Sequence, residues 1–271
     1  MKQKPITESE SLYDGLEEMS TMDLLQNINR EDQKVAPAVQ LVIPKVGQLV
    51  DEAVERFKRG GRLIYIGAGT SGRLGILDAS EIPPTFGMSP DRVLGLIAGG
   101  DTAIRQAVES AEDSPKQAEL DLANIGINKN DTVVGIAASG TTPYVVGGVE
   151  YANQCGALTA GITNNLHTPL AQVAHITIEI IVGPEFVTGS TRMKSGTSQK
   201  MVLNMISTSL MIKVGRIKGN KMVNMQLNNN KLVNRGIHFL MDELKVSEAE
   251  AAQLLKEHGS VHKAMQSRGI D

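Results

Sequence analysis

The chain of 271 residues has a formal net charge of −3 and is 41% hydrophobic and 21% charged, which suits one α/β domain with small additions. The slight negative charge and the 3% of aromatic residues argue against nucleic acid as a partner, because they provide neither a basic nor a base-stacking surface. No apolar run is long enough to span a membrane, and the polar N-terminus does not resemble a signal peptide. The single cysteine, Cys155, excludes a disulfide framework. We therefore expect a cytoplasmic protein with no membrane partner.

The N-terminal part of the chain, residues 1–35, is polar and predicts a helical arm with two short helices, around Leu12–Met19 and Thr21–Asn29. Residues 36–227 differ, because an amphipathic helix is followed by short apolar runs that alternate with helical segments. Five strands are expected, at Leu63–Ile66, Arg92–Ala98, Thr132–Ala138, Leu158–Ile162 and Ile176–Val182. Such alternation predicts an α/β fold in which helices cover both faces of a parallel sheet. Residues 228–271 predict a small tail of two short helices.

A phosphate-binding loop is predicted where the first strand meets the next helix, at Gly67-Ala68-Gly69-Thr70-Ser71-Gly72. Backbone N–H groups at a glycine turn and the positive end of a helix dipole favour an anion, and the two hydroxyls add donors. The glycine spacing also matches the dinucleotide fingerprint, but the next strand ends in Gly99-Gly100 without the carboxylate that would bind a ribose. We therefore expect Gly69, Thr70 and Ser71 to bind a phosphomonoester rather than a nicotinamide cofactor.

The third predicted strand has the same kind of ending. It runs into Ser139-Gly140-Thr141-Thr142, and a helix is expected from about Pro143. Serine and threonine often do no more than cap a helix. Ligands of open parallel sheets, however, bind beyond the carboxyl ends of the strands, where both loops would lie. Two such loops in one sheet favour a phosphosugar or a similar anion as ligand, which makes Ser139, Gly140, Thr141 and Thr142 further candidate ligands.

Residues 183–200 gather small hydroxyls and cations ahead of an apolar helix that is expected over Met201–Val214. This concentration indicates a crowded polar pocket, in which Ser190 is a candidate donor. Lys194, like Arg192, could neutralise a bound anion or could meet a partner subunit, and the sequence leaves both interpretations open.

Two glutamates are candidates for general acid and base chemistry. Glu81 comes at the end of the helix that begins at the first loop, just before a double proline that is expected to stop this helix. A second helix is expected to be capped by Asp101, and along it Ile104, Val108 and Glu112 would form one row. A carboxylate that continues an apolar row faces inward, where burial raises its pKa and suits it to proton transfer. Spacing alone leaves a purely structural role open for either glutamate.

No metal and no cofactor are expected. The five histidines do not cluster, and the only pair with a ligand-like spacing is His258 and His262. No third ligand lies near this pair in the sequence, so we interpret both as surface residues.

Three segments carry long and specific motifs, namely Gly67–Gly75, Asp78–Thr85 and Gly183–Lys200. They resemble the N-acetylmuramic acid 6-phosphate etherases, which are bacterial enzymes of the sugar isomerase (SIS) superfamily, and the resemblance covers roughly residues 6–230. It implies a three-layer α-β-α SIS fold with a five-stranded parallel sheet, and it implies a homodimer. The family usually continues after Asn228 through about one more helical pair than this chain has.

The resemblance implies cleavage of the lactyl ether of a phosphosugar, N-acetylmuramate 6-phosphate, which gives N-acetylglucosamine 6-phosphate and D-lactate in cell-wall recycling. It implies that Glu112 is the base that takes the C2 proton and that Glu81 is the proton donor to the departing lactate oxygen. Water then adds to the double bond. Glucokinase regulatory protein shares the Gly183–Lys200 signature, so a non-catalytic sugar-phosphate sensor is one alternative, and an aldose–ketose phosphosugar isomerase on the same fold is another.

Overall fold

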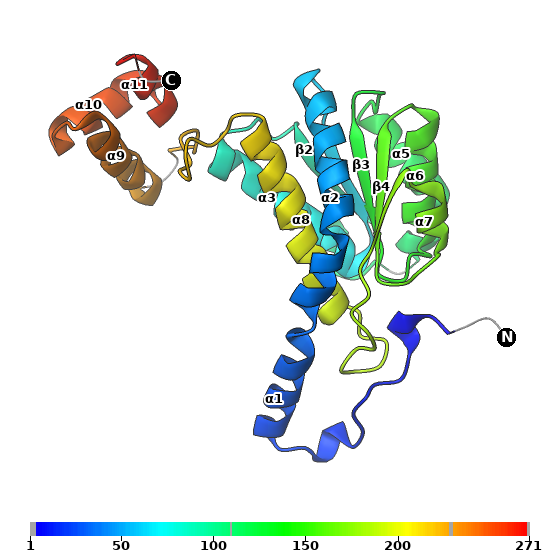
Figure 1. The fold of residues 1–271 in the computed structure, drawn as a ribbon. Coiled ribbons are helices and arrows are strands. Elements are labelled where there is room, and N and C mark those ends of the chain that lie inside the picture. Colours follow the sequence, from blue (N-terminus) through cyan, green and yellow to red (C-terminus); the bar gives the residue numbers. More distant parts are fainter. Residues whose placement is uncertain (1–3, 109, 228–229, 270–271) are drawn as a thin grey trace.

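In the computed structural model, which describes residues 4–108, 110–227 and 230–269, five parallel strands form a sheet between two layers of helices (Figure 1). The strands are β1 Leu63–Gly67, β2 Val93–Ile97, β3 Thr132–Ile136, β4 Leu158–Thr163 and β5 Ile176–Glu179. Their order is β2-β1-β3-β4-β5, so the chain first adds β2 on one side of β1 and then continues on the other side. The predicted α/β fold with a five-stranded parallel sheet is confirmed.

The strands end level with one another at the carboxyl edge of the sheet. Gly67, the last residue of β1, is paired with Ile97 of β2 and with Ile136 of β3, and Ile136 is paired with Ile162 of β4. The loops that follow these strands therefore leave the sheet side by side. The switch point of the topology lies between β1 and β3, which is the place where ligands of open α/β sheets bind.

The two faces of the sheet pack against different helices (Figure 1). On one face lie α2 Val35–Lys58, α3 Gly69–Phe86 and α8 Lys194–Lys213, and on the other lie α5 Pro115–Asn124, α6 Pro143–Gln154 and α7 Pro169–Val173. Strand β1 serves both cores, because Tyr65 packs with the first set while Ile64 and Ile66 pack with the second. Burial on both faces explains why the strands read as continuous apolar runs in the sequence.

The N-terminal arm consists of two 3₁₀ turns, Ile6–Glu8 and Leu16–Glu18, and the helix α1 Thr21–Asp32. The helix expected around Leu12–Met19 is therefore only a short turn, whereas the helix expected at Thr21–Asn29 is present. Helix α1 extends away from the sheet (Figure 1). The segment before it returns to the carboxyl edge, where the ring centroids of Tyr13 and Phe186 lie 4.9 Å apart.

The sequence had predicted that the double proline would stop helix α3. In the structure the helix does not stop there. It continues through Pro83 and Pro84 to Phe86 and ends at Gly87, which has a left-handed conformation. Proline holds φ near the helical value, so the helix can continue although two N–H groups are missing. The N–H of Gly87 then closes the last turn on the carbonyl of Pro83, at 2.9 Å.

The helix expected from Asp101 to Glu112 is also different. Helix α4 spans only Gly100–Arg105 and is preceded by Gly99, so Asp101 is not its cap. The chain then turns back, and Val108 packs directly over the backbone of Gly99. Glu112 lies on a separate 3₁₀ turn, Ala111–Asp113, and is exposed. The predicted apolar row with an inward carboxylate is therefore wrong, because the helix that would carry it ends too early.

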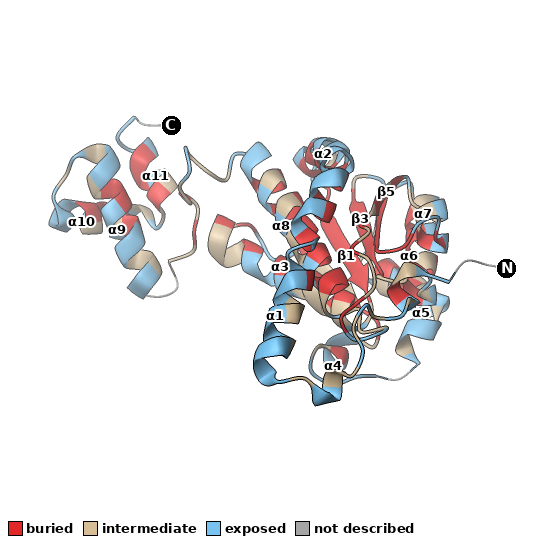
Figure 2. Ribbon diagram, turned by 60° about the horizontal axis from the view of Figure 1, so that its bottom comes forward, coloured by how far each residue is buried: buried red, intermediate tan, exposed pale blue. Residues whose placement is uncertain are grey.

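The C-terminal helices form a separate cluster with its own apolar core (Figure 2). They are α9 Asn230–Leu244, α10 Glu248–His258 and α11 Val261–Gln266. The sequence had predicted two helices, and the third was missed because its 6 residues are too few for a periodic pattern. Helix α10 begins at its expected cap, where the hydroxyl of Ser247 accepts the N–H of Glu250. The core of this cluster includes Val223 and Met225, ahead of residue 228, the predicted start of the tail, which lies outside the described residues.

Candidate active site at the carboxyl edge of the sheet

The first predicted phosphate loop forms the N-terminus of α3. The helix begins at Gly69, so the N–H groups of Gly69, Thr70 and Ser71 have no carbonyl one turn earlier in the helix and lie at the positive end of its dipole. Gly69 has a φ of +52°, which glycine adopts without strain. Thr70 is half-buried and its methyl group faces Gly196 at the start of α8. This arrangement can bind an anion through backbone N–H groups.

The hydroxyl of Ser71 has a partner within the protein. It is buried and donates a hydrogen bond of 2.8 Å to Oε1 of Gln199. The Ser71 hydroxyl is thus bonded within the protein, and its expected role as a phosphate donor stays a prediction. The backbone N–H of Ser71 keeps its place in the first turn of α3.

The second predicted loop, Ser139–Thr142, follows β3 and leads into α6. Gly140 has a φ of +70°, and a side chain there would lie 2.4 Å from Thr168, so the turn requires glycine. The N–H and the hydroxyl of Thr141 both donate to Oγ of Ser139, at 3.2 and 3.1 Å. Thr142 precedes α6 but makes no capping hydrogen bond with its side chain. Capping therefore does not account for the Thr142 hydroxyl, which is consistent with a role in binding.

A cavity of about 240 Å³ joins the first loop to Glu112. Gly69 and Arg73 of α3 line one side, and Ser110 and Glu112 line the other. Arg73 is held by a hydrogen bond of 2.9 Å from its Nε to the carbonyl of Ile104. The cavity thus combines a helix N-terminus, a guanidinium group that the sequence analysis did not single out, and a carboxylate.

Glu81 does not line this cavity. It lies twelve residues after Gly69 on α3, which corresponds to about 18 Å along the helix axis. Its side chain is exposed and continues a row with Arg73 and Leu77, four residues apart on one face of the helix. Leu77 is 44% exposed, so this row is an uncovered ridge with an apolar centre. A single copy of the chain does not bring Glu81 and Glu112 into one cavity.

Lys194 is buried and its charge is neutralised within the chain. Its Nζ lies 2.6 Å from Oε2 of Glu31, and the Lys194 side chain is only 1% exposed. Burial alone would raise the pKa of Glu31, but hydrogen bonds from Lys194, Lys34 and Tyr13 outweigh it and lower this pKa to about 2. The ion pair fastens the N-terminal arm to the start of α8, and the expectation that Lys194 binds the phosphate stays a prediction.

The N-terminus of α8 is occupied in a similar way. The carboxylate of Glu185 accepts hydrogen bonds from the N–H groups of Lys194 and Ser195, each at 2.9 Å, and another from the Ser195 hydroxyl at 2.7 Å. An anion that belongs to the chain thus fills this helix terminus. Ser190 lies in the turn before α8 and is half-buried, and its role in binding stays a prediction.

Two residues that the sequence analysis missed lie at the end of β4. Asn164 is fully buried and Asn165 is 4% exposed, and their side chains connect to the two predicted phosphate loops. The signal that could have indicated them is a pair of neutral polar residues directly after an apolar strand, at the edge where ligands bind.

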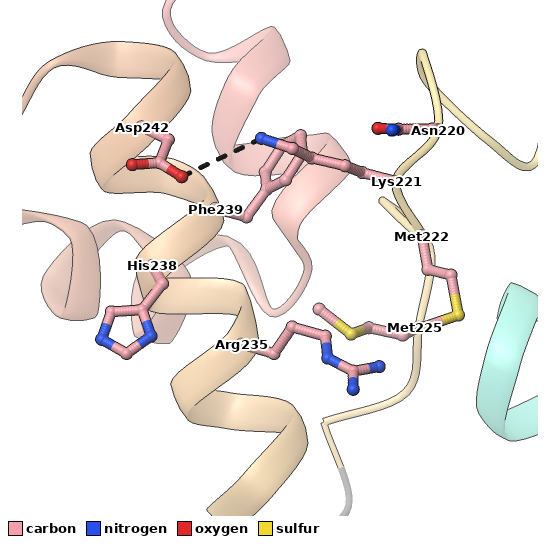
Figure 3. Close-up of a pocket in the computed structure, with 8 residues that line it drawn as sticks. All are labelled: Asn220, Lys221, Met222, Met225, Arg235, His238, Phe239 and Asp242. Carbon is pink, nitrogen blue, oxygen red and sulfur yellow. Dashed lines mark ion pairs between the residues drawn. The ribbon is translucent and has the colours of Figure 1, made fainter.

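A second cavity, of about 350 Å³, lies between the segment before α9 and α9 itself (Figure 3). Lys221 and Asp242 face each other across it, with Nζ 3.9 Å from the carboxylate, and Lys221 also lies over the ring of Phe239. Arg235 and His238 line another part of the wall. None of the predicted site residues lines this cavity, so its size alone does not make it the candidate active site.

Within residues 4–108, 110–227 and 230–269, no group of three or more His, Cys, Asp or Glu side chains is arranged to hold a metal ion. In the same part of the chain, no helix combines the length and the apolar character that are needed to cross a membrane.

The sheet and its loops place the chain in the class of SIS-domain proteins. A model described as "SIS domain" matches residues 108–209, and one described as "Glucokinase regulatory protein N-terminal SIS domain" matches residues 45–153. The structure is similar to a phosphoheptose isomerase from Francisella tularensis, with a TM-score of 0.54 and 18% identity over 72% of this chain and 100% of that one. A phosphoheptose isomerase from Neisseria gonorrhoeae is also similar, with a TM-score of 0.53 and 14% identity over 71% of this chain and 97% of that one. At these identities the similarity shows the fold.

More similar relatives identify the family. The N-acetylmuramic acid 6-phosphate etherase of Porphyromonas gingivalis (strain ATCC 33277) is 60% identical over 262 residues, which are 97% of this chain and 96% of the relative. The etherase of Christiangramia forsetii is 59% identical over 97% of this chain and 96% of the relative. The etherase of Pasteurella multocida is 52% identical over 92% of this chain and 83% of the relative. The chain belongs to the N-acetylmuramic acid 6-phosphate etherase family. The match spans 96% of the Porphyromonas and Christiangramia proteins, so the tail of this chain is not short in comparison with theirs. The tail is shorter only in comparison with longer relatives, such as the Pasteurella protein, of which 83% is matched.

Proposed function

We propose that this chain cleaves the lactyl ether of N-acetylmuramate 6-phosphate, with the carboxyl edge of the sheet as the site and Glu112 as the base. The observation that carries the proposal is 60% identity to a named etherase over nearly the whole chain, together with a cavity that joins a helix N-terminus to a carboxylate. The protein is then a carbon–oxygen lyase whose products are N-acetylglucosamine 6-phosphate and D-lactate. The sensor and isomerase alternatives are not favoured, because the relatives that match along most of the chain are named as etherases.

The phosphate is assigned to the crevice between β1 and β3. The N–H groups of Gly69, Thr70 and Ser71 supply donors at a helix N-terminus, and the hydroxyls of Thr70 and Thr142 add two more. Arg73 lines the adjoining cavity and contributes a positive charge beside the anion. Ser139, Thr141 and Ser190 remain further candidates, while Lys194 is left out because its ammonium group is paired with Glu31.

The chemistry needs a base and an acid. In the open-chain sugar the C1 aldehyde makes the C2 proton acidic, so a carboxylate can remove it. The C3–O bond then breaks, an acid protonates the departing lactate oxygen, and water adds to the double bond of the resulting unsaturated aldehyde. Glu112 is assigned to the first step because it lines the cavity next to the anion site.

The acid is assigned to Glu81 of a second copy of the chain. About 18 Å of helix separates Glu81 from Gly69, so within one copy it does not reach the substrate bound at the loop. Glu81 is exposed beside Leu77, an apolar side chain that is 44% exposed, and a second copy packed on this ridge would cover it. A homodimer in which each subunit lends Glu81 to the other therefore accounts for both the separation of the glutamates and the uncovered ridge.

Release of D-lactate from N-acetylmuramate 6-phosphate by the purified protein tests the activity. In D₂O the product should carry deuterium at C2, and in H₂¹⁸O it should carry the label on the C3 oxygen of the sugar rather than on lactate. Glu112→Gln should lower kcat by about 10²–10⁴-fold, the usual share of a positioned base. A product that keeps its C2 hydrogen would exclude Glu112 as the carbon base even if lactate were released.

Mixed dimers test the assignment of Glu81. Glu81→Gln and Glu112→Gln should each be nearly inactive alone. If Glu81 acts on the site of its partner, a random mixture of the two variants restores one intact site in half of the dimers, or about a quarter of the wild-type rate. Mixtures that stay inactive, with dimer exchange confirmed by mass spectrometry, would place both glutamates in the same subunit.

A further inference from the structure

The side chains of Asn164 and Asn165 are each connected by hydrogen bonds to a different loop of the candidate active site. Both residues are almost completely buried, at 0% and 4% exposure, directly after β4. A buried amide is costly unless its donors and acceptor are all bonded, so its partners identify what it holds in place. The hydrogen bonds of the two side chains reach two separate parts of the structure.

Asn164 is connected to the first loop through the side chain of Gln199. Its Nδ2 donates to the carbonyl of Ile180 and to the hydroxyl of Ser198, each at 2.9 Å. Its Oδ1 accepts from Nε2 of Gln199 at 3.2 Å, and Oε1 of Gln199 accepts the hydroxyl of Ser71 at 2.8 Å. The amide is fully bonded, and one hydrogen-bonded chain runs from the end of β4 to the first turn of α3.

Asn165 is hydrogen-bonded directly to the second loop. Its Nδ2 donates to the carbonyl of Ser139 at 3.1 Å and to the hydroxyl of Thr7 at 2.8 Å. Its Oδ1 accepts the N–H of Thr7 at 3.1 Å. Thr7 belongs to the N-terminal arm and is itself only 2% exposed. Asn165 thus ties the arm and the second loop to the same point of the sheet.

We infer that Asn164 and Asn165 are positioning residues, which fix the two loops relative to each other on either side of the phosphate, and that Thr7 completes this support. The inference rests on the proposed function, because it takes the two loops as the phosphate site. Each loop follows its own strand, so their separation would otherwise depend on flexible turns. Two bonded amides on adjacent residues hold both turns to one rigid strand end, and preorganised donors bind an anion more tightly.

The arm provides a mild test of this support. Thr7→Val keeps the shape of the side chain but removes the hydroxyl that Asn165 binds, whereas Thr7→Ser keeps the hydroxyl. Ser11→Ala is the matched control, because Ser11 also fastens the arm, through a bond of 2.7 Å to the carbonyl of Phe186, without touching either loop. Asn165→Asp is the stronger variant, since a carboxylate would face the carbonyl oxygen of Ser139.

The readouts are KM and kcat for lactate release and the dissociation constant of inorganic phosphate, measured by calorimetry. Thr7→Val should raise KM and the phosphate dissociation constant about 5-fold, and Asn165→Asp about 10- to 100-fold, with kcat changed less than about 2-fold, because uniform binding is lost. Thr7→Ser and Ser11→Ala should stay near wild type. Ser71→Ala, which removes the hydroxyl at the end of the Asn164 chain, should behave like Thr7→Val.

Equal effects of Thr7→Val and Ser11→Ala on phosphate binding would show that the contact only fastens the arm, and would overturn the inference. An unfolded Asn165→Asp protein leaves the decision to the Thr7 pair, which removes or keeps a single hydroxyl. The phosphate titration also separates this inference from the proposed function. A wild-type protein that binds phosphate but releases no lactate would refute the etherase activity alone, whereas unchanged phosphate binding in Thr7→Val, Ser71→Ala and Asn165→Asp would refute the positioning role alone.

Discussion

Replacement of Lys194 by methionine tests whether this side chain is a ligand of the anion or a structural cation within the chain. The structure pairs its ammonium group with Glu31 at 2.6 Å, in a position where both side chains are at most 3% exposed. Removal of one partner of a buried ion pair costs about 3–5 kcal/mol, because the other charge stays buried without compensation. Glu31 keeps hydrogen bonds from Tyr13 and Lys34, so we expect the lower value, about 3 kcal/mol, or about 6–12 °C in Tm for a chain of this size.

Urea unfolding followed by circular dichroism measures this loss for Lys194→Met, for Glu31→Gln and for the double variant. Because the two side chains interact directly, the loss in the double variant should be smaller than the sum of the single losses by about 1–3 kcal/mol. Lys34→Met is the matched control. Lys34 binds the same carboxylate at 2.6 Å, but its side chain is 47% exposed, so its removal should cost less than about 1 kcal/mol.

The kinetic result decides whether Lys194 also contacts substrate. If its role is structural, KM of the folded Lys194→Met protein, measured well below its Tm, should stay within about 3-fold of wild type. A rise in KM of more than about 10-fold together with unchanged stability would refute the reasoning, because it would mean that the ammonium group is available to the phosphate and that the Glu31 pair contributes little.

Two further predictions concern the pH dependence of stability. The folded-state pKa of Glu31 is about 2, below its ordinary value of 4.5, so the stabilisation that it provides is fully present above about pH 4.5 and is lost as pH falls toward 2. Acid titration of the unfolding free energy should show a loss of about 3 kcal/mol that Glu31→Gln lacks. Asp78 is the opposite case, because burial raises its pKa although Tyr65 and Ser207 bind it, so its contribution is lost as pH rises above its unfolded pKa. Asp78→Asn removes this titrating group, so the unfolding free energy of the variant should fall less than that of wild type as pH rises from 4 to 7, and an unchanged pH dependence would contradict this account.

The sheet and the first-loop turn could be predicted from the sequence because the interactions that define them are local. Each strand is buried on both faces, which produces a continuous apolar run, and the glycine turn follows the first run directly. The cap at Ser247 is local as well, since its hydroxyl bonds an N–H only three residues further on. Where the determining contact lies within about one helical turn, spacing and residue type are sufficient.

The hydrogen-bond partners of the site residues could not be predicted, because these contacts join residues that are distant in the sequence. Lys194 and Glu31 are 163 positions apart, and Ser71 and Gln199 are 128 apart, so no local pattern could show that these side chains already have partners inside the protein. Asn165 and Thr7, separated by 158 positions, were missed for the same reason. The sequence therefore indicated the polar residues of this edge but could not separate those that face a ligand from those that hold the loops.

The exposure of both candidate catalytic glutamates has a consequence for the mechanism. The expected helix over Asp101–Glu112 would have buried the base, but the chain turns back at Val108 and leaves Glu112 at the surface of its cavity. Proton transfer is favoured where water is excluded, because charges interact more strongly in a region of low dielectric constant. One copy of the chain does not provide such exclusion at Glu112 or at Glu81, and in the proposed mechanism the sugar and a second copy of the chain would supply it. A mixed dimer that recovers activity would therefore show that the acid comes from the second copy of the chain.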